Sequence, residues 1–156
     1  MSRRPRSSAE LVEFDAALSA FVRDFGLNEP ERTPCTVPIP VADARTLTVV
    51  AAGPIPQSAL AAELGVSAST VSRVVDRLVQ QGWVERRADA HDRRRLLLQV
   101  TGAGARMARE MAARRRARHA EVLGRLNADQ RRQVVDGLRL LAQASNADAA
   151  SARAGG

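Results

Sequence analysis

Arginine and short hydroxyl side chains gather between residues 57 and 95, and both are residue types that contact DNA. Arginine can donate two hydrogen bonds to the major-groove edge of guanine, and hydroxyl groups contact phosphates. One group of these residues begins at Ser67 and follows a helical spacing, and a run of three arginines ends at residue 95. The candidate DNA-binding residues are Ser58, Ser67, Ser69, Thr70, Ser72, Arg73, Arg77, Arg93, Arg94 and Arg95.

Two arginines of the helical group lie one turn apart. Arg73 has the reach for a bidentate contact with guanine. Arg77 could reach a base edge or a backbone phosphate, and both assignments stay open. Asp76 would repel phosphate, so we expect it to hold Arg73 or another arginine through a local ion pair. The alternative interpretation of this surface is an ordinary solvated helix face.

The helical group requires a helix-turn-helix to place it. Residues 57–64 predict a short helix, Gly65 permits the tight bend, and Ser67 opens a second helix that runs to Gly82. The second helix has an apolar face spaced i, i+3, i+4, i+7. That face is Val71, Val74, Val75 and Leu78, and the residues expected to complete a small core are Leu60, Ala61, Leu64 and Val66.

The arginine run lies at the tip of a predicted β-hairpin with strands over residues 83–87 and 96–100. Such a tip is narrow enough for the minor groove, where negative potential attracts arginine. Neighbouring side chains of a strand point to opposite faces. Two assignments therefore stay open: Arg93 and Arg95 share one side while Arg94 pairs with Asp92, or the reverse.

Residues 60–104 resemble the winged-helix core of the MarR family of bacterial transcriptional regulators. The matching elements are Gly82 after the second helix, the strand residues 84–86, Asp92 and Arg94 in the hairpin tip, and residues 100–104 at the start of the next helix, with valine in place of the usual leucine. The resemblance implies a homodimer whose terminal helices intertwine and whose two winged helices read a pseudo-palindromic operator in double-stranded DNA. We therefore expect a sequence-specific repressor released by a small-molecule effector.

The expected fold class is all-α with a small β-hairpin wing, flanked by N- and C-terminal dimerisation helices. The predicted segments are a dimerisation helix over 8–26, a proline-rich loop over 27–40, the winged helix-turn-helix over 41–100, C-terminal helices over 101–145 and a disordered tail over 146–156. A chain of 156 residues can bury a core of this size without a disulfide or a structural metal.

Apolar stripes at both ends of the chain predict the dimer interface. The first stripe has spacings of 3, 4, 3 and 4, the seam of a helix that packs on another helix. The last helix begins with Asn127 and Gln130, which form a capping-box signature. An intramolecular bundle is the alternative, but stripes at both ends favour a shared core. The dimerisation residues are Leu11, Phe14, Leu18, Phe21, Phe25, Val134, Leu138 and Leu141.

The loop over residues 27–40 holds four prolines around Cys35, the single cysteine of the chain. Prolines reduce the entropy lost when a loop orders, so the loop could form a semi-rigid flap that senses an effector. A reactive thiol needs nearby positive charge, which Arg32 or Arg45 could supply. One alternative function is therefore a redox-sensing regulator that acts through Cys35, and the other interpretation of Cys35 is an unreactive thiol.

The positive charge of the chain is concentrated around the winged helix. Residues 66–118 hold 13 arginines against five acidic residues, and all 24 basic residues of the chain are arginine. Such a segment should bind polyanions in a salt-dependent way, and it favours an anion as the small-molecule ligand. Arg114, Arg115, Arg116 and Arg118 form a solvated helix face or contact a phosphate or anionic ligand.

Several classes of protein are excluded by what the sequence lacks. No apolar run is long enough for a membrane span, and the first residues do not resemble a secretory signal, so we expect a cytoplasmic protein. We expect that the protein is not an enzyme and that it binds no cofactor or metal. The sequence has no glycine-rich phosphate loop, no catalytic triad pattern and no ligand cluster at zinc spacing. A winged-helix module that binds another protein, without specific DNA binding, is the remaining alternative.

Overall fold

The structure is a computed structural model of the 156-residue chain, and it describes residues 7–28, 37–89 and 95–154. Side chains are described as far as residue 146. The chain forms two compact units, residues 1–115 and 116–156. Helix α1 (Ser8–Asp24) and the winged helix lie in the first unit, and helix α6 (Ala128–Ala154) lies in the second.

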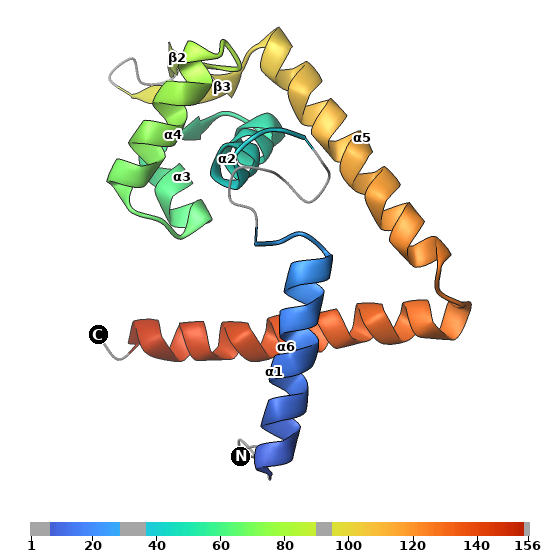
Figure 1. The fold of residues 1–156 in the computed structure, drawn as a ribbon. Helices are drawn as coiled ribbons and strands as arrows, with labels where there is room; N and C mark the ends of the chain where they lie inside the picture. The colour runs from blue at the N-terminus through green and yellow to red at the C-terminus, as the bar shows by residue number, and fades with distance from the viewer. Residues whose placement is uncertain (1–6, 29–36, 90–94, 155–156) are drawn as a thin grey trace. The chain divides into compact units, whose positions relative to one another are not determined.

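The winged helix is built from three helices and a small sheet (Figure 1). Its elements follow the order α2 (Val41–Ala52), β1 (Ile55–Pro56), α3 (Gln57–Leu64), α4 (Ala68–Gln80), β2 (Val84–Ala88) and β3 (Leu96–Val100). The antiparallel sheet has the strand order β1-β3-β2. The predicted fold class, helical with a small wing, is confirmed.

The core lies between α2, α3, α4 and the sheet. Apolar side chains from all of these elements are almost completely buried, and helix α2 packs against both α4 and β3. The apolar face predicted for the second helix of the motif supplies much of this core. The most buried large side chains are Leu47, Val50, Leu60, Val71, Val75, Leu78, Val84 and Leu98.

The helix-turn-helix lies where it was predicted, except that α4 ends at Gln80 and not at Gly82, and local signals explain its turn. Gly65 ends α3 in the left-handed region, at φ 66°, where glycine has no steric penalty. Ser67 caps α4 by accepting a hydrogen bond from the Thr70 backbone N–H at 3.2 Å. Val66, which we expected in the core, is 41% exposed, because it lies in the turn between these two signals and not on a helix face.

Two features of the winged helix were not predicted. Val37 and Ile39 belong to the segment assigned to the proline-rich loop, yet both are buried in the core before α2 begins. Strand β1 is only two residues long, and it pairs Ile55 with Leu98 and Pro56 with Leu97. A strand of this length is too short to show an alternating pattern, and the proline fits because it lies at an edge of the sheet.

Helix α5 (Gly102–Gly124) follows the wing, and helix α6 follows α5. The predicted capping box is present, since Asn127 and Gln130 each accept the other's backbone N–H at 2.9 Å. The predicted disordered tail over 146–156 is wrong as far as Ala154, because α6 continues to that residue. The tail is rich in alanine, which has the highest helix propensity of all residues and needs no apolar stripe to form a helix.

Candidate nucleic-acid interface

A cluster of hydroxyl groups lies at the exposed start of helix α4. The Ser67 hydroxyl is 3.0 Å from that of Ser69 and 2.9 Å from that of Thr70. All three residues are exposed, as is Ser58 on α3, while Ser72 is half-buried. Helix starts carry backbone N–H groups and a partial positive charge that favour a phosphate. The cluster therefore combines the donors and the exposure that a phosphate contact needs.

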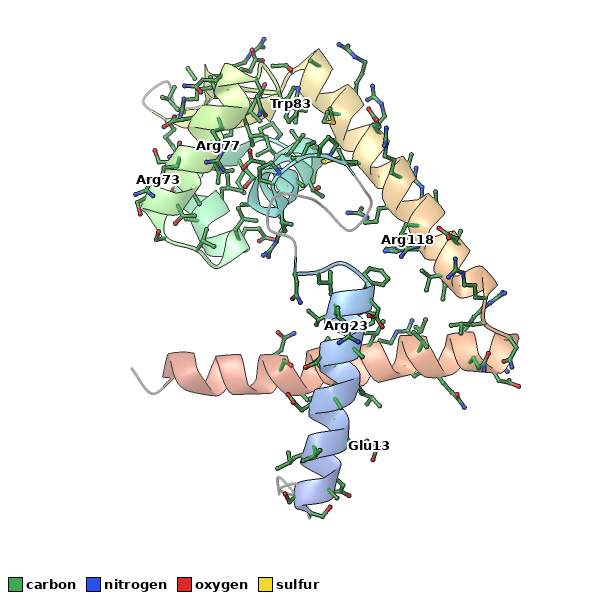
Figure 2. The ribbon with its side chains drawn as sticks, in the orientation of Figure 1. Glu13, Arg23, Arg73, Arg77, Trp83 and Arg118 are labelled. Atoms are coloured by element: carbon green, nitrogen blue, oxygen red, sulfur yellow. The ribbon has the colours of Figure 1, made fainter. Side chains whose placement is uncertain are left out.

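Arg73 is exposed on α4, one turn after this cluster. Figure 2 shows its side chain on the outer side of the helix, away from α2. Within the described ranges, no carboxylate forms an ion pair with it. A solvent-facing guanidinium in this position has the donors for a bidentate contact with a base edge.

Arg77 lies one turn further along α4 and has a different environment. Its Nε donates to Asp43 Oδ2 at 3.2 Å, and its Nη2 donates to Asp43 Oδ1 at 2.5 Å. The Asp43 side chain is 1% exposed, whereas that of Arg77 is 45% exposed. The predicted contact between Arg77 and DNA stays a prediction, and a carboxylate 34 positions away competes for the guanidinium.

Asp76 forms an ion pair, as expected, but its partner comes from the wing. Arg86 Nη2 on β2 donates to Asp76 Oδ1 at 2.6 Å. The sequence predicts an ion pair between Asp76 and Arg73 or another arginine. It does not identify Arg86 on β2 as the partner, because the two residues meet only in the folded chain. This pair connects the middle of α4 to the first strand of the wing.

The described part of the wing is a regular hairpin. Strands β2 and β3 pair in register from Val84 opposite Val100 to Ala88 opposite Leu96. The Asp89 N–H donates to the Arg95 carbonyl at 2.9 Å, and the Arg95 side chain is exposed. Arg93, Arg94 and Asp92 lie outside the described residues. Which wing arginine enters a groove therefore stays a prediction.

A tight joint connects the wing to α5, and its role was not recognised from the sequence. The Thr101 hydroxyl donates to the Gly82 carbonyl at 2.6 Å and accepts from the Gly104 N–H at 3.1 Å. The Thr101 N–H donates to the Trp83 carbonyl at 3.0 Å. A Cβ at position 104 would lie 1.9 Å from that same carbonyl oxygen, so only glycine fits there. The threonine and the glycine three residues later are the signal that could have predicted it.

A cavity of about 340 Å³ lies where α2, β3 and α5 meet in the first unit. Its walls are mostly apolar and its one charged lining residue is Arg109. The sequence did not predict it, because the lining comes from three separate segments. The lining residues are Thr48, Ala51, Ala52, Val100, Ala105, Ala108 and Arg109.

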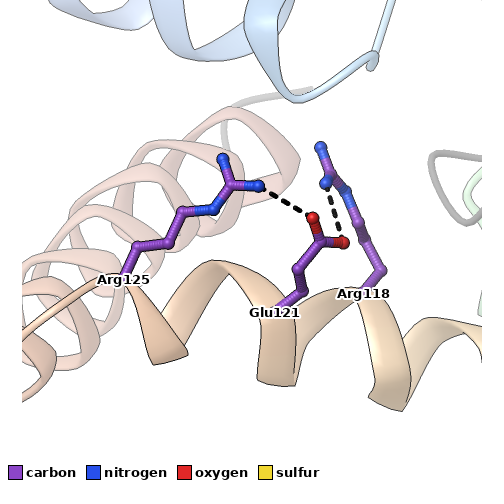
Figure 3. Close-up of polar contacts among 3 residues, drawn as sticks. All are labelled: Arg118, Glu121 and Arg125. Carbon is purple, nitrogen blue, oxygen red and sulfur yellow. Dashed lines mark hydrogen bonds and ion pairs between the residues drawn. The ribbon is translucent and has the colours of Figure 1, made fainter.

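The arginines in the middle of α5 are partly paired with acidic residues on the same helix. Arg114 donates to Glu110 at 2.7 Å. Further along, Glu121 accepts from Arg118 at 3.3 Å and from Arg125 at 2.8 Å (Figure 3). Arg115 and Arg116 are exposed, and no ion pair involves either within the described residues. Exposed pairs of this kind contribute little to stability and are typical of a solvated face.

The predicted dimerisation residues are exposed apolar side chains. Those of α1 form one helix face, on which the Phe21 and Phe25 rings contact each other with centroids 5.1 Å apart. Phe25 is half-buried, and all the others are between 42% and 53% exposed. Cys35, the redox candidate, lies outside the described residues. None of the helices in the described ranges is long and apolar enough to cross a membrane.

Comparisons with known proteins agree with this geometry. Residues 38–95 match the model of the MarR family. The transcriptional repressor MprA of Escherichia coli K12 is 42% identical over 57 residues, which are 36% of this chain. The chain spans 32% of the length of the curated relatives that it matches.

Solved structures extend the likeness to most of the chain. RV1404 from Mycobacterium tuberculosis has a TM-score of 0.71 and 28% identity, over 92% of this chain and 98% of that one. FabT from Streptococcus pneumoniae, solved in complex with DNA, has a TM-score of 0.68 and 20% identity, over 90% of this chain and 98% of that one. The likeness to FabT is one of fold.

Proposed function

We propose that the protein is a sequence-specific, homodimeric DNA-binding repressor that a small-molecule effector releases, because residues 38–95 match the model of the MarR family. Members of this family are transcriptional regulators and not enzymes. The observation that carries the proposal is the solvent-facing Arg73 guanidinium next to the hydroxyl cluster at the start of α4.

In the proposed complex, α4 is the recognition helix and lies in the major groove. Arg73 reads a guanine, and the hydroxyl groups of Ser67, Ser69 and Thr70 contact phosphates. Ser58 and Ser72 belong to the edge of the same surface. The wing follows the backbone into the adjacent minor groove with Arg95 and its two neighbours, Arg93 and Arg94. FabT shares this fold and was solved in complex with DNA, which supports DNA binding as the function.

The proposed DNA-binding unit is a homodimer. Two winged helices related by a two-fold axis would read half-sites about 10 base pairs apart, centre to centre. The exposed apolar stripes of α1 and α6 support a shared dimer core, because monomeric proteins rarely leave contiguous apolar faces in solvent. The proposed location is the cytoplasm, where a bacterial chromosome is accessible.

The cavity between α2, β3 and α5 supports the proposal that the protein binds a small-molecule effector. Its volume of about 340 Å³ falls in the range of small-molecule sites, and its apolar walls with one arginine suit a compact apolar anion. No observation on the described residues favours the redox alternative at Cys35 or a protein-binding module that lacks specific DNA binding.

The proposal is tested by DNA binding across a salt series. We expect the purified protein to protect an inverted repeat in the intergenic DNA beside its own gene, and to prefer that DNA over random duplex at physiological salt. Equal affinity for both, with the same steep decline as salt rises, would mean only nonspecific attraction to a basic surface. In that case the search would turn to a protein partner.

A further inference from the structure

We propose that Asp43 is a positioning residue for DNA reading, because its ion pair with Arg77 sets the orientation of the recognition helix α4 on helix α2. This inference rests on the proposed function. It assigns to Arg77 a role inside the protein in place of the predicted contact with a base or a phosphate.

The ion pair between Arg77 and Asp43 is bidentate. Two different nitrogens of Arg77 donate to the two different oxygens of Asp43, at 3.2 and 2.5 Å. Bidentate pairs between arginine and a carboxylate add geometric specificity to the strength of a charge-assisted hydrogen bond. Asp43 lies in the first turn of α2 and is almost completely buried, so its carboxylate is held in place by the core around it.

Helix α2 also packs against α4 through buried apolar side chains, which cannot supply the same precision. Leu47 of α2 and Val74 of α4 belong to the same buried core cluster, and the attraction between such side chains is not directional. Helix pairs held by apolar ridges scatter by about 15–20° around their preferred angles. Buried ion pairs contribute little net stability, and their best-established use is to select one register. The pair is suited to orienting the helix.

A small rotation of α4 is enough to matter for reading DNA. Arg73 lies four residues before Arg77, and residues at this spacing occupy the same helix face. A rotation of about 20° moves a side-chain atom that lies about 6 Å from the helix axis by about 2 Å. A hydrogen bond tolerates only a few tenths of an ångström. Releasing Arg77 from Asp43 therefore places Arg73 out of reach of its base edge.

The test compares Asp43→Asn, Arg77→Gln and the double variant with the wild type. The probes are two duplexes, one with the inverted repeat that the wild type protects and one with a scrambled sequence. We expect each single variant to lower the ratio of the two affinities by about tenfold, the effect of one lost base contact. The double variant should lower it no further, because both changes remove the same pair.

The affinity ratio separates positioning from stability. A variant that is partly unfolded loses active protein against both duplexes equally, so its ratio would not change. The double variant also avoids leaving a buried charge without its partner, and it keeps the test valid if a single variant does not fold. Asp136→Asn is the matched control, because it removes the same carboxylate from an exposed pair with Arg139 on α6.

Two outcomes would overturn the inference, and they differ from failure of the proposed function. A wild-type ratio in Asp43→Asn would show that the pair does not orient α4. A loss in Arg77→Gln without a loss in Asp43→Asn would show that Arg77 contacts DNA itself. If the wild type shows no preference for either duplex, the proposed function fails and the inference fails with it.

Discussion

Two arginines four residues apart on one helix differ in what surrounds them. Arg73 faces solvent, whereas Arg77 is held by a buried aspartate. The sequence treats both as candidate DNA contacts, since both lie on the polar face of α4. Their neighbours in space make the first a candidate base reader and the second a candidate for orienting the helix.

Replacing Arg73 with alanine tests the reading residue. We expect the operator affinity to fall by about 1–3 kcal/mol and one base position to become tolerant of substitution. The measurement is a set of dissociation constants for duplexes that vary each base of a half-site. Arg139→Ala on α6 is the control, and an Arg73→Ala variant that still binds both operator and random DNA like the wild type would refute the role.

Replacing Gly104 with alanine tests the joint between the wing and α5. The new Cβ would lie 1.9 Å from the Trp83 carbonyl oxygen, which already accepts the Thr101 N–H. We expect the free energy of unfolding to fall by about 1–3 kcal/mol, the usual cost of overpacking. Urea denaturation measures this quantity.

Gly137 provides the matched control for that substitution. It lies within α6, and a Cβ there meets no atom within 4 Å. Alanine at this position should raise the stability of the helix by up to about 1 kcal/mol, since glycine is a poor helix former. Equal changes in the two variants would argue against a special constraint at position 104.

At the scale of elements, two neighbouring residues of α4 form ion pairs with two different elements. Asp76 pairs with Arg86 on β2, and Arg77 pairs with Asp43 on α2. The recognition helix is therefore tied both to the wing and to the helix that lines the cavity. Of the three arginines at the tip of the wing, Arg95 lies within the described residues.

Replacing Arg95 with alanine tests the wing. If the wing follows the DNA backbone, the affinity for operator and random DNA should fall by similar factors. The slope of log K against log salt should also decrease by about one. Fluorescence anisotropy at several salt concentrations measures both quantities, and an unchanged slope would mean that Arg95 makes no phosphate contact.

At the scale of the whole molecule, the charged and apolar surfaces lie on different parts of the chain. The arginine-rich stretch over residues 66–118 includes α4 and the wing, whereas the exposed apolar stripes lie on α1 and α6. This division is expected of a protein that uses one region to bind DNA and another to bind a second copy of itself. The apolar stripes can be tested separately from the DNA surface.

Replacing Leu138 with aspartate tests the dimer. We expect sedimentation to report a species of 16.8 kDa in place of one twice that mass, with weaker operator binding because one half-site is lost. Leu140→Asp is the control, because Leu140 is exposed but lies about 200° around the helix from Leu138. If both variants sediment like the wild type, α6 does not form the interface.

Much of the fold could be predicted because its signals are local. The turn at Gly65, the cap at Ser67, the apolar face of α4 and the capping box at Asn127 depend on residues within one or two turns of each other. Local hydrogen bonds and helix periodicity are properties of short segments. The predicted tail failed for a related reason, since alanine stabilises a helix without leaving any pattern.

Tertiary structure alone decided the features that join distant segments. These are the choice of Asp43 as partner of Arg77, the choice of Arg86 as partner of Asp76, the burial of Val37 and Ile39, the contact of Gly104 with Trp83 and the cavity beside α5. Each depends on two or more segments meeting in space, at distances that a linear pattern does not encode. The sequence by itself determined which residues could contact DNA, and the packing of α2 against α4 decided that Arg77 meets a buried carboxylate.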